Sequence, residues 1–203
     1  MSPGPAPRTL QIDGFLPQAL HDELLAFALA SEDQFKPTSV RRGDGGVVDH
    51  AVRQSLRCKT GLGPFAEPFT KAVHARLPEL CEALGVAPFA VASTELELAA
   101  HGDGGFYKVH LDTFTQDARL AADSDRAISA VYYFYRQPQG FSGGELQMYR
   151  FGGGLAERIE PRDNRLACFA SIAPHEVLPI ACPNGRFEDY RFAVNCWLHR
   201  PRG

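Results

Sequence analysis

The sequence predicts a mainly β protein of the α+β class, in which a jelly-roll barrel (a double-stranded β-helix) is buttressed by N-terminal helices. In the first part of the chain apolar residues recur with helical spacing, and afterwards they alternate or form short runs separated by Gly, Pro and Asp. A chain of 203 residues with 44% hydrophobic content can bury one full core. We therefore expect a flexible tail over 1–8 and a single domain over 9–203, with a helical part at about 9–88 and a barrel at about 89–199.

The N-terminal part contains a short strand and two helical patterns. Leu10 and Ile12 indicate an edge strand, and the apolar spacing that follows predicts a helix over about 17–30. A second amphipathic helix is expected over about 67–84, where a glycine follows as a stop signal. Residues 37–63, between the two helices, lack clean periodicity and predict an exposed loop.

Short strands dominate the second part. They are expected over about 93–100, 106–112, 127–135, 144–149, 157–160, 166–170, 175–180 and 191–198. Short strands at this spacing are typical of a sandwich or barrel. The polar segment 113–125 is long for a strand connection, and both a lid and an ordinary surface loop fit it.

Composition limits the classes of partner and compartment. A formal charge of -3 and a pI near 6.2 predict no general attraction to nucleic acid or to anionic membranes. No apolar run reaches the length of a membrane span. The five cysteines are scattered without a CxxC pair, which favours neither a disulfide framework nor a zinc knuckle and predicts a cytoplasmic protein.

Three residues have the chemistry of a metal site. His110 and Asp112 are two positions apart, so in a strand their side chains point to the same side, and His175 follows 63 positions after the aspartate. Two imidazoles and one carboxylate form the facial triad of non-haem Fe(II) oxygenases. A chain of this composition contains about 0.4 His-X-Asp triplets by chance, so the triplet alone is weak evidence. The alternatives are a surface His-Asp pair and a structural role for His175. Only the combination of the three residues indicates a metal site.

The last expected strand has two faces of different character. Its apolar face, expected to pack against the helices, consists of Phe192, Val194, Cys196 and Leu198. Arg191, Asn195 and Trp197 lie on the other face and should line the barrel interior. A buried arginine is costly unless an anion meets it, and Tyr133, on the inward side of 127–135, is placed to donate its hydroxyl to the same anion. The alternative is an arginine at the rim that pairs with a nearby carboxylate.

Four motifs follow one another over about residues 94–199. They are Phe106-Tyr107-Lys108-Val109-His110-Leu111-Asp112, Gly143-Gly144-Glu145-Leu146, His175-Glu176-Val177 and Arg191-Phe192-Ala193-Val194-Asn195-Cys196-Trp197. In this order they resemble the motifs of the prolyl 4-hydroxylase-like branch of the Fe(II)/2-oxoglutarate dioxygenases. The resemblance implies that His110, Asp112 and His175 hold Fe(II), and that 2-oxoglutarate and O2 are consumed with release of succinate and CO2.

The resemblance also implies roles around the metal. It implies that Arg191 binds the far carboxylate of 2-oxoglutarate. An apparent insertion over 181–190 lengthens the interval from His175 to this arginine, so Arg186 is the alternative for this role. Tyr133 matches a tyrosine that assists the cosubstrate in the family. Tyr107 matches another recurrent family position, but residues i and i-3 face opposite sides of a regular strand, so its contact with the site stays open.

Three classes of function compete at this point. The resemblance favours hydroxylation of a prolyl residue in a protein or peptide, with a free amino acid or a carrier-tethered metabolite as alternative substrates. A catalytically silent cupin-like binding module is the second class, but cupins usually carry His-X-His where this chain has Asp112. A zinc hydrolase is the third, and no general-base glutamate stands beside His110. We expect residues 37–63 and 113–125 to border the substrate groove.

Overall fold

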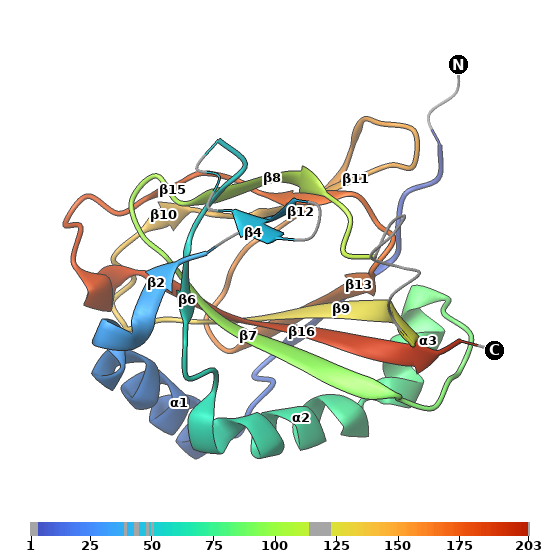
Figure 1. Cartoon of the computed structure of the whole chain (residues 1–203), viewed down its shortest axis with the longest axis horizontal. Coiled ribbons are helices and arrows are strands. Elements are labelled where there is room, and N and C mark those ends of the chain that lie inside the picture. Colours follow the sequence, from blue (N-terminus) through green and yellow to red (C-terminus); the bar gives the residue numbers. More distant parts are fainter. Residues whose placement is uncertain are drawn as a thin grey trace.

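The computed structural model describes residues 4–38, 40–42, 45–47, 49, 51–113 and 123–202. Within these ranges, most strands belong to a large and a small antiparallel sheet, and helices cover the outer face of the large one (Figure 1). The chain passes repeatedly from one sheet to the other, which is the connectivity of a jelly roll. The predicted fold class is therefore confirmed.

The large sheet has the strand order β1-β13-β9-β16-β7-β6-β2. Its strands are β1 (Thr9–Asp13), β2 (Phe35–Pro37), β6 (Leu56–Cys58), β7 (Ser93–His101), β9 (Ser124–Phe134), β13 (Arg165–Ala170) and β16 (Arg191–Pro201). The two longest strands, β9 and β16, are paired at its centre, from Phe192 opposite Phe134 to Pro201 opposite Ser124. The predicted strand at Leu10 and Ile12 is confirmed as the edge strand β1.

The small sheet has the order β12-β11-β14-β8-β5. Its strands are β5 (Arg53–Gln54), β8 (Phe106–His110), β11 (Leu146–Tyr149), β12 (Leu155–Ile159) and β14 (His175–Val177). Two short ladders pair β3 (Val40–Arg42) with β4 (Gly45–Val47) and β10 (Ser142–Gly143) with β15 (Ile180–Ala181). The expectation of a strandless loop over 37–63 was wrong, because β5 and β6 join the small and the large sheet, respectively. β5 pairs with β8, and β6 pairs with both β7 and β2, so these short segments become strands through partners elsewhere in the chain.

The helices are α1 (Gln18–Ala30), α2 (Ala66–Ala75) and α3 (Leu77–Leu84), with short 3-10 turns η1 (Glu32–Gln34), η2 (Gly63–Phe65) and η3 (Phe187–Asp189). The first predicted helix is confirmed. The single helix expected over 67–84 was wrong: Pro78, which has no N–H to bond back into α2, lies in the first turn of α3, and the helix breaks at Arg76. No helix in the described part of the chain is long and apolar enough to cross a membrane.

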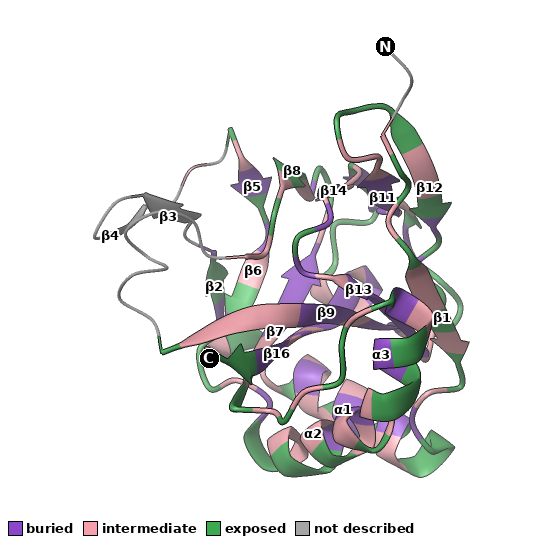
Figure 2. Cartoon of the chain, turned by 90° about the vertical axis from the view of Figure 1, so that its right-hand side faces the viewer, coloured by how far each residue is buried: buried purple, intermediate pink, exposed green. Residues whose placement is uncertain are grey.

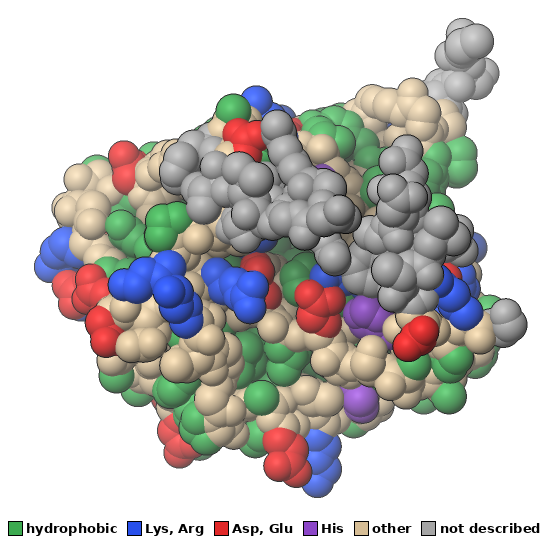
Figure 3. Space-filling model, in the orientation of Figure 1, with side chains coloured by type: hydrophobic (Ala, Val, Ile, Leu, Met, Phe, Trp, Pro, Cys, Tyr) green, Lys and Arg blue, Asp and Glu red, His purple; other side chains and the backbone are tan. Residues whose placement is uncertain are grey.

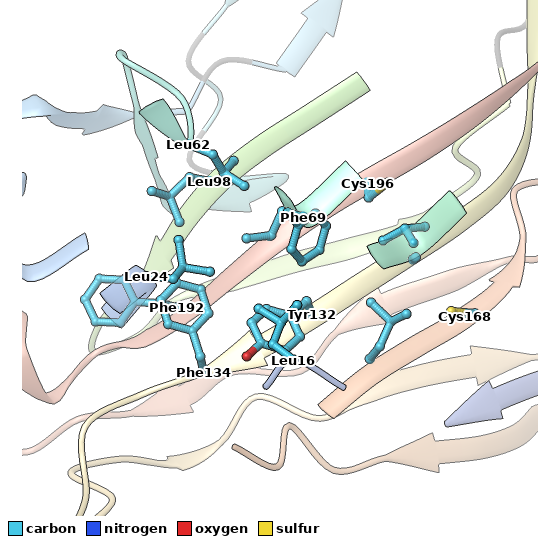
Figure 4. Close-up of a cluster of buried hydrophobic side chains, with 14 of the residues drawn as sticks. Leu16, Leu24, Leu62, Phe69, Leu98, Tyr132, Phe134, Cys168, Phe192 and Cys196 are labelled. Carbon is cyan, nitrogen blue, oxygen red and sulfur yellow. The ribbon is translucent and has the colours of Figure 1, made fainter. Parts of the chain in front are cut away.

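The main core lies between the helices and the large sheet. The apolar face of β16 packs there with Tyr132 and Phe134 of β9, Leu24 of α1 and Phe69 of α2 (Figure 4). Figure 2 shows the buried stretches of β9 and β13 with the helices below them, which are buried in some parts and exposed in others. The alternation predicted for the last strand is therefore confirmed, and it leaves the opposite faces of β9 and β16 to line the space between the sheets.

Candidate metal centre and its pocket

Two strands of the small sheet bring the three predicted metal ligands together. His175 on β14 is directly opposite His110 on β8, although 65 positions separate them in the chain. His110 Nε2 lies 3.6 Å from Asp112 Oδ1, and His175 Nε2 lies 3.6 Å from Asp112 Oδ2. One ligand atom of each residue lies within 4.8 Å of the others, which is the spacing of atoms that share one metal ion.

The backbone sets the proton position on both imidazoles. His110 Nδ1 lies 2.8 Å from the carbonyl oxygen of Lys108, and His175 Nδ1 lies 2.9 Å from that of Ala173. A carbonyl can only accept, so each Nδ1 carries the proton and donates it, which leaves each Nε2 with a free lone pair. Burial lowers the pKa of His175 to about 4, so this ring is neutral at physiological pH.

Asp112 is held as an ionised carboxylate just beyond the end of β8. Its backbone N–H donates to the Ser171 carbonyl at 3.0 Å, and the Ser129 hydroxyl donates to Oδ2 at 2.7 Å. Burial alone would raise the pKa of Asp112, but His175, His110 and the Ser129 hydrogen bond hold that pKa well below its ordinary value. The centre therefore offers two imidazole nitrogens and one negatively charged oxygen ligand.

Arg191 lies on the large-sheet wall of the same pocket. Its side chain is 1% exposed; Nη1 donates to the Gly144 carbonyl at 2.6 Å and Nη2 to His101 Nδ1 at 3.0 Å. Among the described residues, Arg191 Nε and the Tyr133 hydroxyl are buried without a hydrogen-bond partner. Burial lowers the pKa of Arg191 to about 10, so the guanidinium stays charged. The charged guanidinium and these two unpaired donors together are suited to bind the carboxylate of an organic acid.

The glycine motif and the apparent insertion explain why Arg191, and not Arg186, occupies the pocket. Gly144 has a φ of +76°, and a Cβ there would lie 2.6 Å from the Ile180 side chain, so only glycine brings its carbonyl to Arg191 without a clash. Arg186 is 57% exposed and pairs with Asp189 at 2.9 Å. The structure therefore places Arg191 inside the barrel and Arg186 outside it.

Tyr107 contacts the metal centre because β8 is irregular. His110 is opposite His175, but Tyr107 is opposite Val177, so two residues of β8 face one residue of β14 in a bulge. The extra residue turns Tyr107 to the side of His110, and their rings stack with centroids 3.6 Å apart at 20°. The contact of Tyr107 with the site, which the sequence left open, is therefore made through the bulge.

The other predicted pocket residues also line the space between the sheets. Asn195 donates to Glu97 Oε1 at 3.1 Å, and the Trp197 ring is covered by Arg126, whose Cζ lies 4.1 Å from the ring centroid. The segment 113–125 was also expected to border the groove, but its residues 114–122 lie outside the described residues.

Three polar residues of the pocket were not predicted. Arg53, His101 and Ser129 line it together with the metal ligands. Ser129 shares the inward face of its strand with Tyr133, so the alternation of 127–135 could have revealed it. Arg53 and His101 carry no such signal, because they reach the pocket through the pairing of β5 with β8 and of β7 with β16.

The chemistry of the donor set fits one divalent iron and one dicarboxylic acid. The triad would hold the ion through two nitrogens and one oxygen and leave it open to further ligands. The unpaired donors on Arg191 and Tyr133 lie on the opposite sheet, so an acid that reaches between the sheets would meet the metal at one end and the guanidinium at the other.

Comparison with known families and proteins adds independent findings. Residues 96–199 match the profile of the 2OG-Fe(II) oxygenase superfamily, which is just over half of the chain. Over 141 residues the chain is 37% identical to an uncharacterized PKHD-type hydroxylase of Synechocystis sp., a match that covers 63% of this chain and 43% of that protein. The chain thus corresponds to less than half the length of this relative.

Solved structures resemble nearly the whole chain. A prolyl-4-hydroxylase of Pseudomonas putida has a TM-score of 0.67 and 26% identity, covering 97% of this chain and 94% of its own. A prolyl hydroxylase of Trichoplax adhaerens, solved with a hypoxia inducible factor peptide fragment, has a TM-score of 0.70 and 21% identity, covering 95% and 83%. The viral collagen prolyl hydroxylase of Paramecium Bursaria Chlorella virus-1 has a TM-score of 0.60 and 16% identity, covering 95% and 96%. The last two likenesses concern the fold alone.

Proposed function

The chain belongs to the 2OG-Fe(II) oxygenase superfamily, and we propose that it is an Fe(II)- and 2-oxoglutarate-dependent hydroxylase that acts on a prolyl residue of a protein or peptide. The observation that carries this proposal is the pocket itself, which has the three candidate metal ligands on one wall and, on the other, a buried guanidinium whose Nε has no hydrogen-bond partner among the described residues. Family membership and the carboxylate at position 112 favour this function over the cupin-like binding module and the zinc hydrolase.

Each wall of the pocket has a distinct task in the proposed reaction. His110, Asp112 and His175 hold the iron and leave its remaining positions to small ligands, and the bound iron with 2-oxoglutarate and O2 supplies the oxidising power that hydroxylates a C–H bond. Arg191 and Tyr133 bind the far carboxylate of 2-oxoglutarate through the Nε and hydroxyl groups, for which the described part of the chain offers no hydrogen-bond partner. This fixes the acid between the two sheets before the substrate arrives.

The rim of the pocket supports a peptide-like substrate. Trp197 lines the pocket together with the metal ligands, and an aromatic wall of this kind suits the packing of a pyrrolidine ring. The likeness to the Pseudomonas putida prolyl-4-hydroxylase over almost the whole chain supports the same substrate class. On the face drawn in Figure 3, basic side chains lie beside acidic ones, which supports a peptide more than a nucleic acid.

A turnover assay with matched peptides tests the proposal. The protein is supplied with Fe(II), 2-oxoglutarate and O2, and succinate formation is followed together with the gain of one oxygen atom in the peptide by mass spectrometry. Proline-containing peptides are compared with the same peptides carrying alanine, and with free amino acids. We expect oxygen to be gained only at proline in peptides. Hydroxylation of free amino acids or of a carrier-bound metabolite, with no reaction on any proline peptide, would reject the prolyl assignment and leave the family membership intact.

A further inference from the structure

The two metal-binding histidines are supported very differently. His175 is 4% exposed and lies inside the barrel, where its ring is 4.5 Å from that of Phe169. His110 lies at the end of β8, a strand whose neighbouring residue Val109 is 53% exposed. The His175 ring is therefore fixed by packing against the core, whereas the His110 ring has little contact with buried apolar side chains.

Tyr107 supplies the missing support on His110. The two rings are nearly parallel, with a centroid separation of 3.6 Å. Its own strand also holds the His110 ring through the hydrogen bond from Nδ1 to the Lys108 carbonyl, at 2.8 Å, and the His175 ring lies 4.2 Å away but is tilted by 57°. A single hydrogen bond allows the imidazole ring to rotate about it, whereas a ring stacked on the imidazole also fixes the orientation of its plane.

Tyr107 is itself held in place by a buried polar group. Arg53 is opposite Tyr107 in the pairing of β5 with β8, and its Cζ lies 4.9 Å from the centroid of the tyrosine ring. The guanidinium is fixed in turn, because Nε donates to the Ser55 hydroxyl at 2.7 Å and Nη2 donates to Glu97 Oε1 at 2.6 Å. The tyrosine thus contacts a fixed cation as well as the metal ligand.

We propose that Tyr107 is a positioning residue for the metal ligand His110. The bulge in β8 brings its ring onto the imidazole, and the stack presets His110 Nε2 toward the shared metal position before the ion arrives. The energy of the stack is then part of the affinity for the metal, since an unsupported ring must be ordered when the ion binds. This inference rests on the triad as the metal site and is independent of the substrate.

The test separates the ring of Tyr107 from its hydroxyl. Co(II) serves as the probe, and its affinity for the metal-free protein is measured by anaerobic titration of its visible absorption, without turnover. Tyr107→Leu removes the stack and should weaken Co(II) binding about two- to tenfold, the range expected for one aromatic pair. Tyr107→Phe keeps the ring and should bind as the unmodified protein does.

Controls make each outcome decisive. The unfolding temperature of each metal-free variant is measured, and if Tyr107→Leu is not folded, Tyr107→Met takes its place. Asp112→Ala should abolish the Co(II) spectrum, which checks the site itself separately from the stack. Unchanged affinity in a folded Tyr107→Leu protein would overturn the proposal. Equal weakening in Tyr107→Phe would also overturn it, because the hydroxyl and not the ring would then be responsible.

Discussion

Replacement of Arg191 by alanine is the most informative single change in the pocket. The side chain is 1% exposed and still offers a free Nε beside the unpaired Tyr133 hydroxyl. If these donors bind the far carboxylate of 2-oxoglutarate, Arg191→Ala leaves a buried charge on the cosubstrate without a partner. We expect the cosubstrate to bind much more weakly, although the three metal ligands are untouched.

The size of the effect follows from the burial of the pair. Loss of one partner of a buried, hydrogen-bonded charge pair costs about 2–5 kcal/mol, which corresponds to a roughly 30-fold to several-thousand-fold rise in Kd. Arg186→Ala is the matched control, because that side chain is 57% exposed and pairs with Asp189 on the outside of the barrel. It should leave the Kd for 2-oxoglutarate within about twofold, as exposed ion pairs contribute little.

Anaerobic titration with Fe(II) and then 2-oxoglutarate measures these affinities through the weak visible charge-transfer band of the chelate. The same titration with 2-oxobutanoate, which lacks the far carboxylate, completes a double-mutant cycle. The unmodified protein should bind 2-oxobutanoate far more weakly than 2-oxoglutarate, and Arg191→Ala should hardly distinguish the two acids. Equal discrimination by both proteins, or a loss of 2-oxoglutarate binding in Arg186→Ala instead, would refute the assignment of Arg191.

Three further changes test the metal centre and the sheet around it. Asp112→Ala should abolish Fe(II) binding while circular dichroism shows a folded metal-free protein, because the core forms without the ion; an unfolded variant would contradict this. Ser129→Ala removes the donor to Asp112 Oδ2, and isothermal titration should show about tenfold weaker metal binding; equal affinity would mean that Asp112 needs no such support. The hydrogen bond from Arg165 lowers the pKa of Asp13 below its ordinary value of 3.8. The ionised Asp13 therefore stabilises the folded protein at pH values above 3.8, and this stabilisation is lost as the pH falls through the lower pKa of the folded state. Asp13→Asn should therefore flatten the acid limb of a stability-against-pH curve, by a small amount at this exposed site, and an unchanged limb would show that the pair contributes nothing.

Much of the site was predictable because strand alternation is a local property. Side chains two positions apart share a face, so the sequence alone places His110 with Asp112, and Arg191 with Trp197, whatever the neighbouring strands are. The same rule separates the apolar face of β16, which packs on the helices, from the face that lines the pocket. The family motifs occur in the same order, and for this reason the metal ligands and the fold class could be predicted together.

Features that depend on pairing between distant segments could not be predicted this way. Arg53 and His101 enter the pocket only because β5 pairs with β8 and β7 pairs with β16, and nothing in their own neighbourhoods marks them. Tyr107 reaches His110 because β8 is bulged against β14, which comes much later in the chain. By itself the sequence determined which residues share a strand face and which chemistry they carry. The tertiary structure decided which faces meet, because strand register and bulges are set by contacts between residues far apart in the chain.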